Sequence, residues 1–349
     1  MLPSFAHRTT GYANSAAPRA ADPATLQQLA GRTMGTTWSL RFDNPAMLPL
    51  VEVRTAVETA LDEVVAQMSH WAPESALSRY NRAPGGSSHP LPPAFAAVLR
   101  CALEEADRSA GALDPTVGPL VRLWGFGPDA APSDEAHVAP SAAEREATRA
   151  RCGWEKLAFD ADSATLFQPG GLTLDFSGIA KGFAVDHAVD ALQALGLRDL
   201  LMEIGGELRV AGRRPGGMPW RVQVANAESD NDAAALTLPL HDMAIATSGD
   251  RWHQRTDGTR RWSHTIDPRT GEPVDHALAA VSVLHTECMR ADALATVLTV
   301  LGPADGLAFA ESHGIAALFN TRAPQGLRTH ASTAWAALHP SSSPPPPRP

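Results

Sequence analysis

The sequence predicts an α+β fold in a single large domain, with antiparallel or mixed sheets and helices that are segregated from them. Two observations carry this prediction. Helical and strand patterns follow one another in blocks rather than in strict alternation, which is typical of α+β proteins. In addition, 44% of the 349 residues are hydrophobic, which is enough to bury a large core. The sequence shows no internal repeat.

The first half of the domain is predicted to be mainly helical. Residues 36–42 alternate between apolar and polar, as a half-buried strand does. Residues 50–68 then carry apolar side chains at helical spacing, and a second helix is expected over 93–110, ending before Gly111. The segment 127–143 is rich in Pro, Ala, Ser and Asp and is expected to be an exposed loop.

The second half is predicted to consist mainly of strands separated by turns. Gly205–Gly206 supplies one turn, and the roles of the flanking Glu203 and Glu207 remain ambiguous. A β-turn is expected at Asp267–Gly271, and the last helix at 290–301. The expected strands are 157–159, 165–168, 172–174, 200–204, 207–211, 221–225, 243–247, 260–266 and 280–284.

Both ends of the chain lack the patterns of folded structure. Residues 1–28 form an Ala-, Pro- and Ser-rich leader that we expect to be disordered, and residues 336–349 form a Ser- and Pro-rich tail of the same kind. The folded domain is therefore expected over residues 29–335. The leader has no continuous apolar segment of a signal peptide and no cysteine for lipid attachment, which favours a cytoplasmic location.

Charge and cysteine content argue against several classes of protein. The formal net charge is −9, and no basic stripe with interleaved aromatic residues occurs, so nucleic acid is not an expected partner. The cysteines Cys101, Cys152 and Cys288 are odd in number and lack metal-binding spacing, so we expect core or surface thiols rather than a disulfide scaffold. No apolar run approaches the length of a membrane span, so none is expected.

The segment Asp175–Asp186, with the sequence DFSGIAKGFAVD, has the features of an anion-binding site. Small residues follow the expected strand 172–174, and an amphipathic pattern begins near Gly182. A short loop before a helix exposes backbone N–H groups at the positive end of the helix dipole, where phosphate binds. Lys181 adds a positive charge and Asp175 a carboxylate. The alternative is an ordinary turn between a strand and a helix.

Asp292 and Thr296 lie four residues apart in the last predicted helix. They therefore project from the same helix face, near its N-terminal end. A carboxylate and a hydroxyl, without His or Cys, suit a hard cation such as Mg²⁺, whose other ligands are carbonyl, water and phosphate oxygens. The same spacing is common in helices that bind no metal, so the pair alone leaves both interpretations open.

His264 is the candidate general base. It lies at the end of an expected strand, just before the turn that begins at Asp267, where side chains often project into clefts. An imidazole ordinarily titrates near neutrality and is suited to taking up a proton. The alternative is a surface histidine, one of 13 in the chain. Asp267 either orients His264 or is simply the first residue of the β-turn.

Three further positions are candidates for contact with a ligand. Trp71 lies in a loop outside any periodic pattern, where an aromatic ring either stacks on a planar ligand or anchors the loop. Met34 is a large apolar residue among polar loop neighbours. The stretch 112–114 follows the second helix, and its small residues and the Asp114 carboxylate either line a pocket or form a turn after the helix.

The order of these motifs resembles the FAD:protein FMN transferase (ApbE) family over about residues 31–319. The blocks that occur in the family's order are TMGT at 33–36, MSHWAPESALSRYN at 68–81, GALDPTVGPL at 111–120, DFSGIAKGFAVD at 175–186, EIGGEL at 203–208, SHTIDPRTG at 263–271 and ADALAT at 291–296. Members of this family bind FAD and Mg²⁺ and cleave the FAD pyrophosphate. They attach FMN by a phosphoester bond to a Thr or Ser of a target flavoprotein and release AMP.

The resemblance implies an ApbE-like fold and a role for each motif. Asp292 and Thr296 look like the family's side-chain ligands to Mg²⁺, with Mn²⁺ as an alternative ion, and the carbonyl of Gly178 resembles its backbone ligand. His264 is similar to the histidine proposed as the base that activates the acceptor hydroxyl. The positions that match the family's contacts with FAD are Met34, Trp71, Ala112, Leu113, Asp114, Asp175, Lys181 and the backbone around Ile266.

The chain departs from the family pattern in two respects. Many members have Tyr where this chain has Trp71, and many are exported, often as lipoproteins, so the alternative location is periplasmic. Two rival functions also remain. An FAD pyrophosphatase, with water as the acceptor, would use the same residues. A non-catalytic flavin-binding or flavin-delivery protein would bind FAD without releasing AMP, and the Asp292 and Thr296 pair argues against it.

Overall fold

The structure, a computed structural model, describes residues 25–128, 138–224, 236–250, 254–258 and 260–339. It confirms the predicted α+β class. Residues 1–24 of the expected leader 1–28, residues 340–349 of the expected tail 336–349 and residues 129–137 of the expected loop 127–143 lie outside these residues. Strand and helix extend slightly past both expected domain boundaries, because β1 begins at Leu26 and α8 ends at Leu338.

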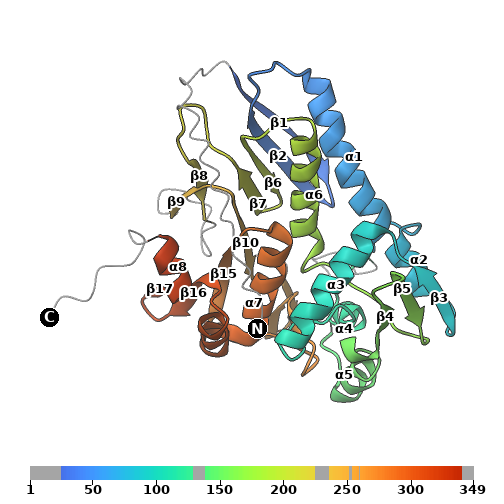
Figure 1. The fold of residues 1–349 in the computed structure, drawn as a ribbon. Coiled ribbons are helices and arrows are strands. Elements are labelled where there is room, and N and C mark those ends of the chain that lie inside the picture. Colours follow the sequence, from blue (N-terminus) through green and yellow to red (C-terminus); the bar gives the residue numbers. More distant parts are fainter. Residues whose placement is uncertain (1–24, 129–137, 225–235, 251–253, 259, 340–349) are drawn as a thin grey trace, which may run out of the picture.

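An eight-stranded sheet forms the centre of the fold (Figure 1). Its strand order is β1-β2-β6-β7-β10-β15-β16-β17, and every neighbouring pair runs antiparallel. β6 and β7 have the bounds that the sequence predicts. The strands are β1 (Leu26–Thr33), β2 (Thr36–Asp43), β6 (Leu200–Ile204), β7 (Glu207–Ala211), β10 (Met243–Gly249), β15 (Leu278–His285), β16 (Ala316–Ala323) and β17 (Gly326–Ala331).

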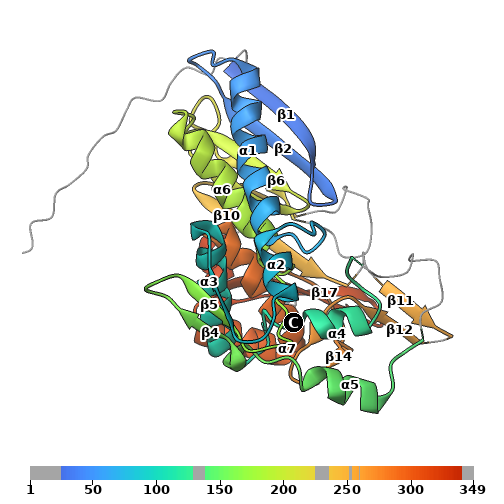
Figure 2. The same cartoon turned by 90° about the vertical axis from the view of Figure 1, so that its right-hand side faces the viewer.

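Three long helices cover one face of this sheet. α1 (Leu50–Met68) and α6 (Ala180–Ala194) lie side by side over the half formed by β1, β2, β6 and β7, and α7 (Cys288–Ser312) follows α6 over β10 and β15 (Figures 1 and 2). α1 has the bounds that its helical spacing predicts. Its core-facing side chains are Val53, Val57, Ala60, Leu61, Val64 and Met68.

Smaller elements cover the opposite face of the sheet. β8 (Trp220–Gln223) pairs with β9 (Thr237–Leu240), and this hairpin packs with α8 (Thr333–Leu338) against the sheet. The strand β7 contributes Leu208 and Val210 to this apolar layer. Because side chains alternate along a strand, the other residues of β7 face the helices.

The remaining elements lie around the lower ends of α1 and α7 (Figure 2). β3, β5 and β4 form a three-stranded sheet, while β11 pairs with β12 and β13 with β14. The elements are α2 (Ala76–Arg82), α3 (Pro93–Arg108), α4 (Gly118–Leu123), α5 (Ala142–Arg149), the 3₁₀ turn Trp154–Lys156, β3 (Ser87–Pro90), β4 (Ala158–Asp160), β5 (Thr165–Gln168), β11 (Gln254–Asp257), β12 (Arg260–Ser263), β13 (Ile266–Asp267) and β14 (Glu272–Pro273).

Residues 172–174 do not form the expected strand. Oδ1 of Asn81 accepts a hydrogen bond from the Leu174 N–H (2.7 Å), and the Asn81 amide donates to the Leu174 carbonyl (2.9 Å). The Gln168 amide donates to the Leu172 carbonyl (2.9 Å). Side-chain amides of the distant Asn81 and the nearby Gln168 thus supply the hydrogen bonds that a neighbouring strand would otherwise provide, which apolar periodicity cannot reveal.

The helix expected over 290–301 is only the first half of α7. The helix continues to Ser312 past a kink at Gly302 (φ 77°) and Pro303. Pro303 has no N–H and cannot donate to the Thr299 carbonyl, four residues earlier. Nε2 of His276 lies 2.8 Å from that oxygen and supplies the hydrogen bond instead. A Cβ at Gly302 would lie 2.7 Å from Cδ2 of His276, so glycine leaves room for the ring.

α7 is also, within the described part of the chain, the one helix that is long and apolar enough to cross a membrane by length and composition. This corrects the expectation that no apolar run approaches that length. Over half of the apolar stretch is buried, and the helix packs against α6, β10 and β15. That environment is the one of a core helix in a folded domain.

We expect His276→Ala to lower the free energy of unfolding by about 1–3 kcal/mol, because the substitution leaves the carbonyl of the buried Thr299 without this donor. Urea unfolding followed by circular dichroism measures the change. The matched control is His330→Ala on β17, where the side chain is exposed and the effect should stay within about 0.5 kcal/mol. Equal stability of His276→Ala and the wild type would contradict this role.

Candidate functional site

Two hairpin turns and the starts of two helices form the candidate site. The Met34–Gly35 turn joins β1 to β2, and the Gly205–Gly206 turn joins β6 to β7. The Gly205 N–H donates to the Thr37 carbonyl (3.1 Å), so the two turns are adjacent. The loop 175–179 leads into α6 on the helical face of the sheet, where α6 packs on α7.

The three residues expected to bind Mg²⁺ lie together where this loop meets α7. Oγ1 of Thr296 donates to the Gly178 carbonyl oxygen (3.3 Å), and Oδ2 of Asp292 accepts from the Gly182 N–H (2.9 Å). A Cβ on Gly178 would lie 2.7 Å from Oγ1 of Thr296, so glycine is needed for this approach. The set of carbonyl, carboxylate and hydroxyl oxygens fits a hard cation that completes its coordination with water and phosphate oxygens.

Burial of Asp292 adds an electrostatic reason for a cation at this position. The residue is buried, and desolvation raises the pKa of its carboxyl, although the Lys181 ammonium and the Gly182 N–H act in the opposite direction. A buried carboxylate is stabilised by a nearby positive charge. Among the described residues, no cluster of three or more His, Cys, Asp and Glu side chains is arranged to hold a metal. Backbone and hydroxyl oxygens therefore have to complete such a site.

Lys181, in the first turn of α6, forms an ion pair with the buried carboxylate of Glu207. Its Nζ lies 2.6 Å from Oε1 of Glu207. Burial alone would lower the pKa of Lys181, but the carboxylates of Glu207 and Asp292 outweigh it and raise the pKa, so the lysine is charged. Burial raises the pKa of Glu207 to about 7; Asp292 adds to this shift and Lys181 opposes it. The start of α6 thus places a fixed positive charge beside the oxygen set.

Asp186, the last residue of the predicted anion-binding segment, anchors α7 to α6. Its carboxylate accepts hydrogen bonds from the N–H groups of Cys288 (3.0 Å) and Met289 (2.9 Å), at the start of α7, and from Nη1 of Arg209 (2.9 Å). A carboxylate at a helix N-terminus also interacts favourably with the helix dipole. These bonds fix the start of α7, and with it Asp292, relative to α6.

Asp175 connects the loop before α6 to the segment after α3. Its N–H donates to the Pro115 carbonyl (2.8 Å), and its Oδ1 accepts from the Ser177 N–H (2.8 Å). A Cβ on Gly118, the first residue of α4, would lie 3.3 Å from Cβ of Asp175. Asp175 therefore shapes the turn into α6 and lies against the start of α4, next to the stretch 112–114.

The side chains of the stretch 112–114 are directed into the protein. Ala112 and Leu113 are buried. Oδ1 of Asp114 accepts from the N–H and Oγ1 of Thr116 (2.7 Å each), and its Oδ2 accepts from the Trp154 N–H (3.2 Å). The carboxylate is therefore part of a turn, one of the two interpretations that the sequence allowed. A ligand can meet this stretch through its backbone rather than through these side chains.

Trp71 and Met34 lie on two different loops. Trp71 is 65% exposed between α1 and α2, and its ring centroid is 5.8 Å from that of His70. A ring that anchored the loop would be buried, so the exposure favours stacking on a ligand. Met34 has a φ of 48° in the β1–β2 turn. This left-handed conformation costs a residue with a Cβ about 1–2 kcal/mol, and such outliers concentrate at functional sites.

His264 lies between β12 and β13, so the strand expected over 260–266 is divided at this residue. Its ring meets Phe126 edge to face, with the centroids 6.2 Å apart and the planes at 71°. The nearby Ile266 is buried in an apolar cluster with Leu120, Trp124, Cys152 and Trp262. The Ile266 side chain is therefore part of the core, and contact of its backbone with a ligand stays a prediction. α4, which supplies Leu120, links this cluster to Asp175.

The Asp267 carboxylate is bound to Arg269. It accepts three hydrogen bonds from the backbone N–H, Nε and Nη2 of Arg269 (2.8–2.9 Å). The Gly271 N–H donates to the Asp267 carbonyl (2.8 Å), which closes the predicted turn. Asp267 is thus the first residue of a turn, the simpler of the two interpretations, and its carboxylate is engaged by Arg269.

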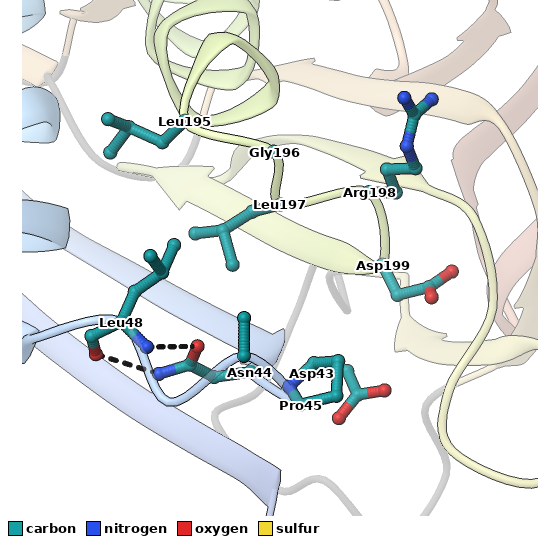
Figure 3. A pocket seen from close by; sticks show the side chains of 10 residues that line it. Asp43, Asn44, Pro45, Leu48, Leu195, Gly196, Leu197, Arg198 and Asp199 are labelled. Atoms are coloured by element: carbon teal, nitrogen blue, oxygen red, sulfur yellow. Dashed lines mark hydrogen bonds between the residues drawn. The ribbon is translucent and has the colours of Figure 1, made fainter.

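A hollow of about 220 Å³ lies at the opposite end of α6 and is distinct from the candidate site (Figure 3). It is formed by the loop after β2 and the loop between α6 and β6. The Asn44 side chain exchanges hydrogen bonds with the backbone of Leu48 there (2.8 and 2.9 Å). None of the predicted ligand, cation or catalytic residues lines this hollow.

An antiparallel sheet with an oxygen set that suits a hard cation, beside a charged lysine at a helix start, defines an α+β protein with a candidate site for an anionic ligand and a cation. The chain belongs to the ApbE family, whose family model matches residues 34–319. The FAD:protein FMN transferase of Vibrio cholerae serotype O1 is 38% identical to it over 315 residues, which cover 90% of this chain and 92% of the relative.

Solved structures agree with this membership. The apo form of the Pseudomonas stutzeri flavinyl transferase ApbE aligns with a TM-score of 0.81 and 38% identity, over 90% of this chain and 96% of that one. The flavin transferase ApbE from Vibrio cholerae aligns with a TM-score of 0.81 and 38% identity, over 89% and 99% of the two chains. These comparisons confirm the family resemblance and the ApbE-like α+β fold.

We expect the three cysteines to be unreactive in the folded protein. All three are buried; burial raises the pKa of Cys101 to about 12 and that of Cys152 to about 11, and raises the pKa of Cys288 well above its usual value. The thiolate is the reactive form. Treatment with Ellman's reagent at pH 8 should therefore label none of them until denaturant is added, after which all three react. Rapid labelling of native protein would contradict this result.

Proposed function

We propose that this protein is a Mg²⁺-dependent FAD:protein FMN transferase, with Mn²⁺ as an alternative metal. It cleaves the pyrophosphate of FAD, attaches FMN by a phosphoester bond to a Thr or Ser of an acceptor flavoprotein, and releases AMP. Membership of the ApbE family supports this proposal. So do the names of its relatives in Vibrio cholerae and Escherichia coli K12, both FAD:protein FMN transferase.

The observation that carries the proposal is the convergence of Gly178, Asp292 and Thr296 beside Lys181. These three oxygens would hold the divalent ion, which when bound supplies Lewis-acid stabilisation of the charge that builds on the pyrophosphate. Lys181 and the backbone N–H groups near the start of α6 hold the phosphates. Because the lysine and both helices are fixed by buried contacts, much of the catalysis is positioning and electrostatics.

His264 takes the proton from the acceptor hydroxyl. The acceptor oxygen forms a bond to the phosphorus of the FMN half, while the bond from this phosphorus to the bridging oxygen breaks and AMP leaves with that oxygen. Trp71 presents an exposed ring on which the isoalloxazine stacks. The buried Ile266 and the stretch 112–114 contribute backbone contacts.

One experiment separates this function from its two rivals. The protein is incubated with FAD and Mg²⁺, with and without a candidate acceptor flavoprotein, and FAD, FMN and AMP are separated by HPLC. Transfer gives AMP and an FMN-labelled acceptor, whereas pyrophosphatase activity gives free FMN and AMP without any acceptor. A flavin-binding or flavin-delivery protein gives neither product, and that outcome would overturn the proposal.

We expect Asp292→Asn to lower the rate of AMP release about 10²- to 10³-fold, the usual effect of losing one electrostatic contact in the transition state. EDTA should abolish the activity of the wild type, and Mg²⁺ or Mn²⁺ should restore it. The matched control is Asp305→Asn, an exposed carboxylate in the second half of the same helix, which should retain the wild-type rate. Wild-type activity in EDTA would show that the metal assignment is wrong.

We expect His264 and Trp71 to affect different steps. His264→Asn should bind FAD with nearly unchanged affinity but transfer FMN about 10²- to 10⁴-fold more slowly, because it removes a general base; the deficit should shrink at higher pH, where hydroxide partly replaces the base. Trp71→Ala should weaken FAD binding and affect the step at saturation less. Fluorescence quenching measures FAD binding, and single-turnover transfer measures chemistry. Loss of FAD binding in His264→Asn would contradict this division.

A further inference from the structure

We propose that Glu207 is a positioning residue that holds the Lys181 ammonium away from Asp292 and so keeps the Asp292 carboxylate available to a divalent cation. This inference rests on the proposed function, because it concerns the same site. No motif of the sequence assigned a role to Glu207, which directly follows the Gly205–Gly206 turn.

The hairpin of β6 and β7 places Glu207 where its side chain can hold the Lys181 ammonium. Glu207 pairs across the hairpin with Ile204, whose side chain belongs to the core beneath the helices. Cross-strand partners lie on the same face of a sheet, so Glu207 is directed at α6. Two residues further along β7, Arg209 reaches Asp186 on the same helix (2.9 Å). The pair between Lys181 and Glu207 (2.6 Å) is thus one of three ion pairs that join β7 to α6 within the described residues, the third being Arg209 to Asp190 (3.8 Å).

Lys181 lies within electrostatic range of both buried carboxylates. The charges of Glu207 and of Asp292 each stabilise its ammonium, but the short contact is to Glu207. Oδ2 of Asp292 is already occupied by the Gly182 N–H. If Lys181 turned to Asp292, the ammonium would compete with a cation for the remaining carboxylate oxygen. Glu207 prevents this competition because it offers the lysine a closer partner.

The burial of Glu207 is hard to explain by stability alone. The residue is 3% exposed, and its Oε2 has no hydrogen-bond partner within the described residues. A buried polar atom without a partner costs about 1–3 kcal/mol. Glu203, on the other side of the same turn, is different, since its carboxylate accepts from the Gly206 N–H (2.8 Å) and from Oγ of Ser39 (3.1 Å). The Glu203 carboxylate therefore stabilises the turn, whereas the Glu207 carboxylate binds the Lys181 ammonium.

A double-mutant cycle tests the proposal. Mn²⁺ binding is titrated by electron paramagnetic resonance in the wild type, Glu207→Gln, Lys181→Met and the double variant, each in the absence of nucleotide and with ADP as a pyrophosphate that carries no flavin. Glu207→Gln should weaken Mn²⁺ binding about tenfold, which is about 1.4 kcal/mol. In the Lys181→Met background the same substitution should have almost no effect, because there is no ammonium left to hold. Glu203→Gln is the matched control and should bind Mn²⁺ as the wild type does.

The outcomes separate this inference from its alternatives. An equal loss of Mn²⁺ affinity in both backgrounds would show that Glu207 acts directly on the cation or on the fold, and this result would overturn the proposal. An unchanged Mn²⁺ affinity in Glu207→Gln would also overturn it. An absence of Mn²⁺ binding by the wild type in both conditions would also overturn it. Thermal unfolding monitors the fold, and Glu207→Met replaces the glutamine variant if that one is unstable. AMP release by the wild type is assayed separately, and it tests the proposed function independently of the result of the double-mutant cycle.

Discussion

The close approach of α6 to α7 at Gly182 is the constraint on which the site depends. A Cβ on this residue would lie 2.7 Å from Cβ of Asp292 and closer still to the Cys288 carbonyl. With only hydrogen there, the Gly182 N–H reaches Asp292, and one turn later Asp186 reaches the first N–H groups of α7. The candidate cation ligands and the lysine are therefore placed by contacts between two helices that both pack on the sheet, which gives the rigidity that a preorganised site needs.

The same packing buries carboxylates away from water, and the cost of their desolvation reduces the stability of the fold. The pKa of Glu207 rises from 4.5 in its reference state to about 7 in the fold, so the folded protein holds this proton more tightly than the unfolded chain. The stabilising contribution of the group is therefore complete below about pH 4.5 and is lost as the pH rises through about 7. Near neutral pH the fold keeps a partly charged, desolvated carboxylate. Retention of such a group is typical of sites where function, and not stability, selects the residue.

Much of the fold was predictable from the sequence because it follows local periodicity. The helix at 50–68 and the strands at 200–204 and 207–211 have the expected bounds. The errors occur where a distant group supplies a hydrogen bond. The side chain of Asn81 replaces the ladder expected at 172–174, and His276 satisfies the carbonyl that Pro303 leaves open, so α7 continues beyond the expected end at 301. Neither partner is identifiable from the pattern of the segment itself.

The same distinction between local pattern and distant contact applies to the candidate site. The convergence of Gly178, Asp292 and Thr296 was predictable because residues four apart share a helix face and the loop before α6 is rich in small residues, and the family resemblance joined these segments. Which of Glu203 and Glu207 meets Lys181 could not be predicted, because both residues flank the same two glycines. The register decides it: Glu203 pairs with Leu208, which packs with β8 and β9, and Glu207 pairs with Ile204, which packs beneath the helices. A turn longer by one residue would exchange the two faces. The length of one turn therefore determines which carboxylate meets Lys181.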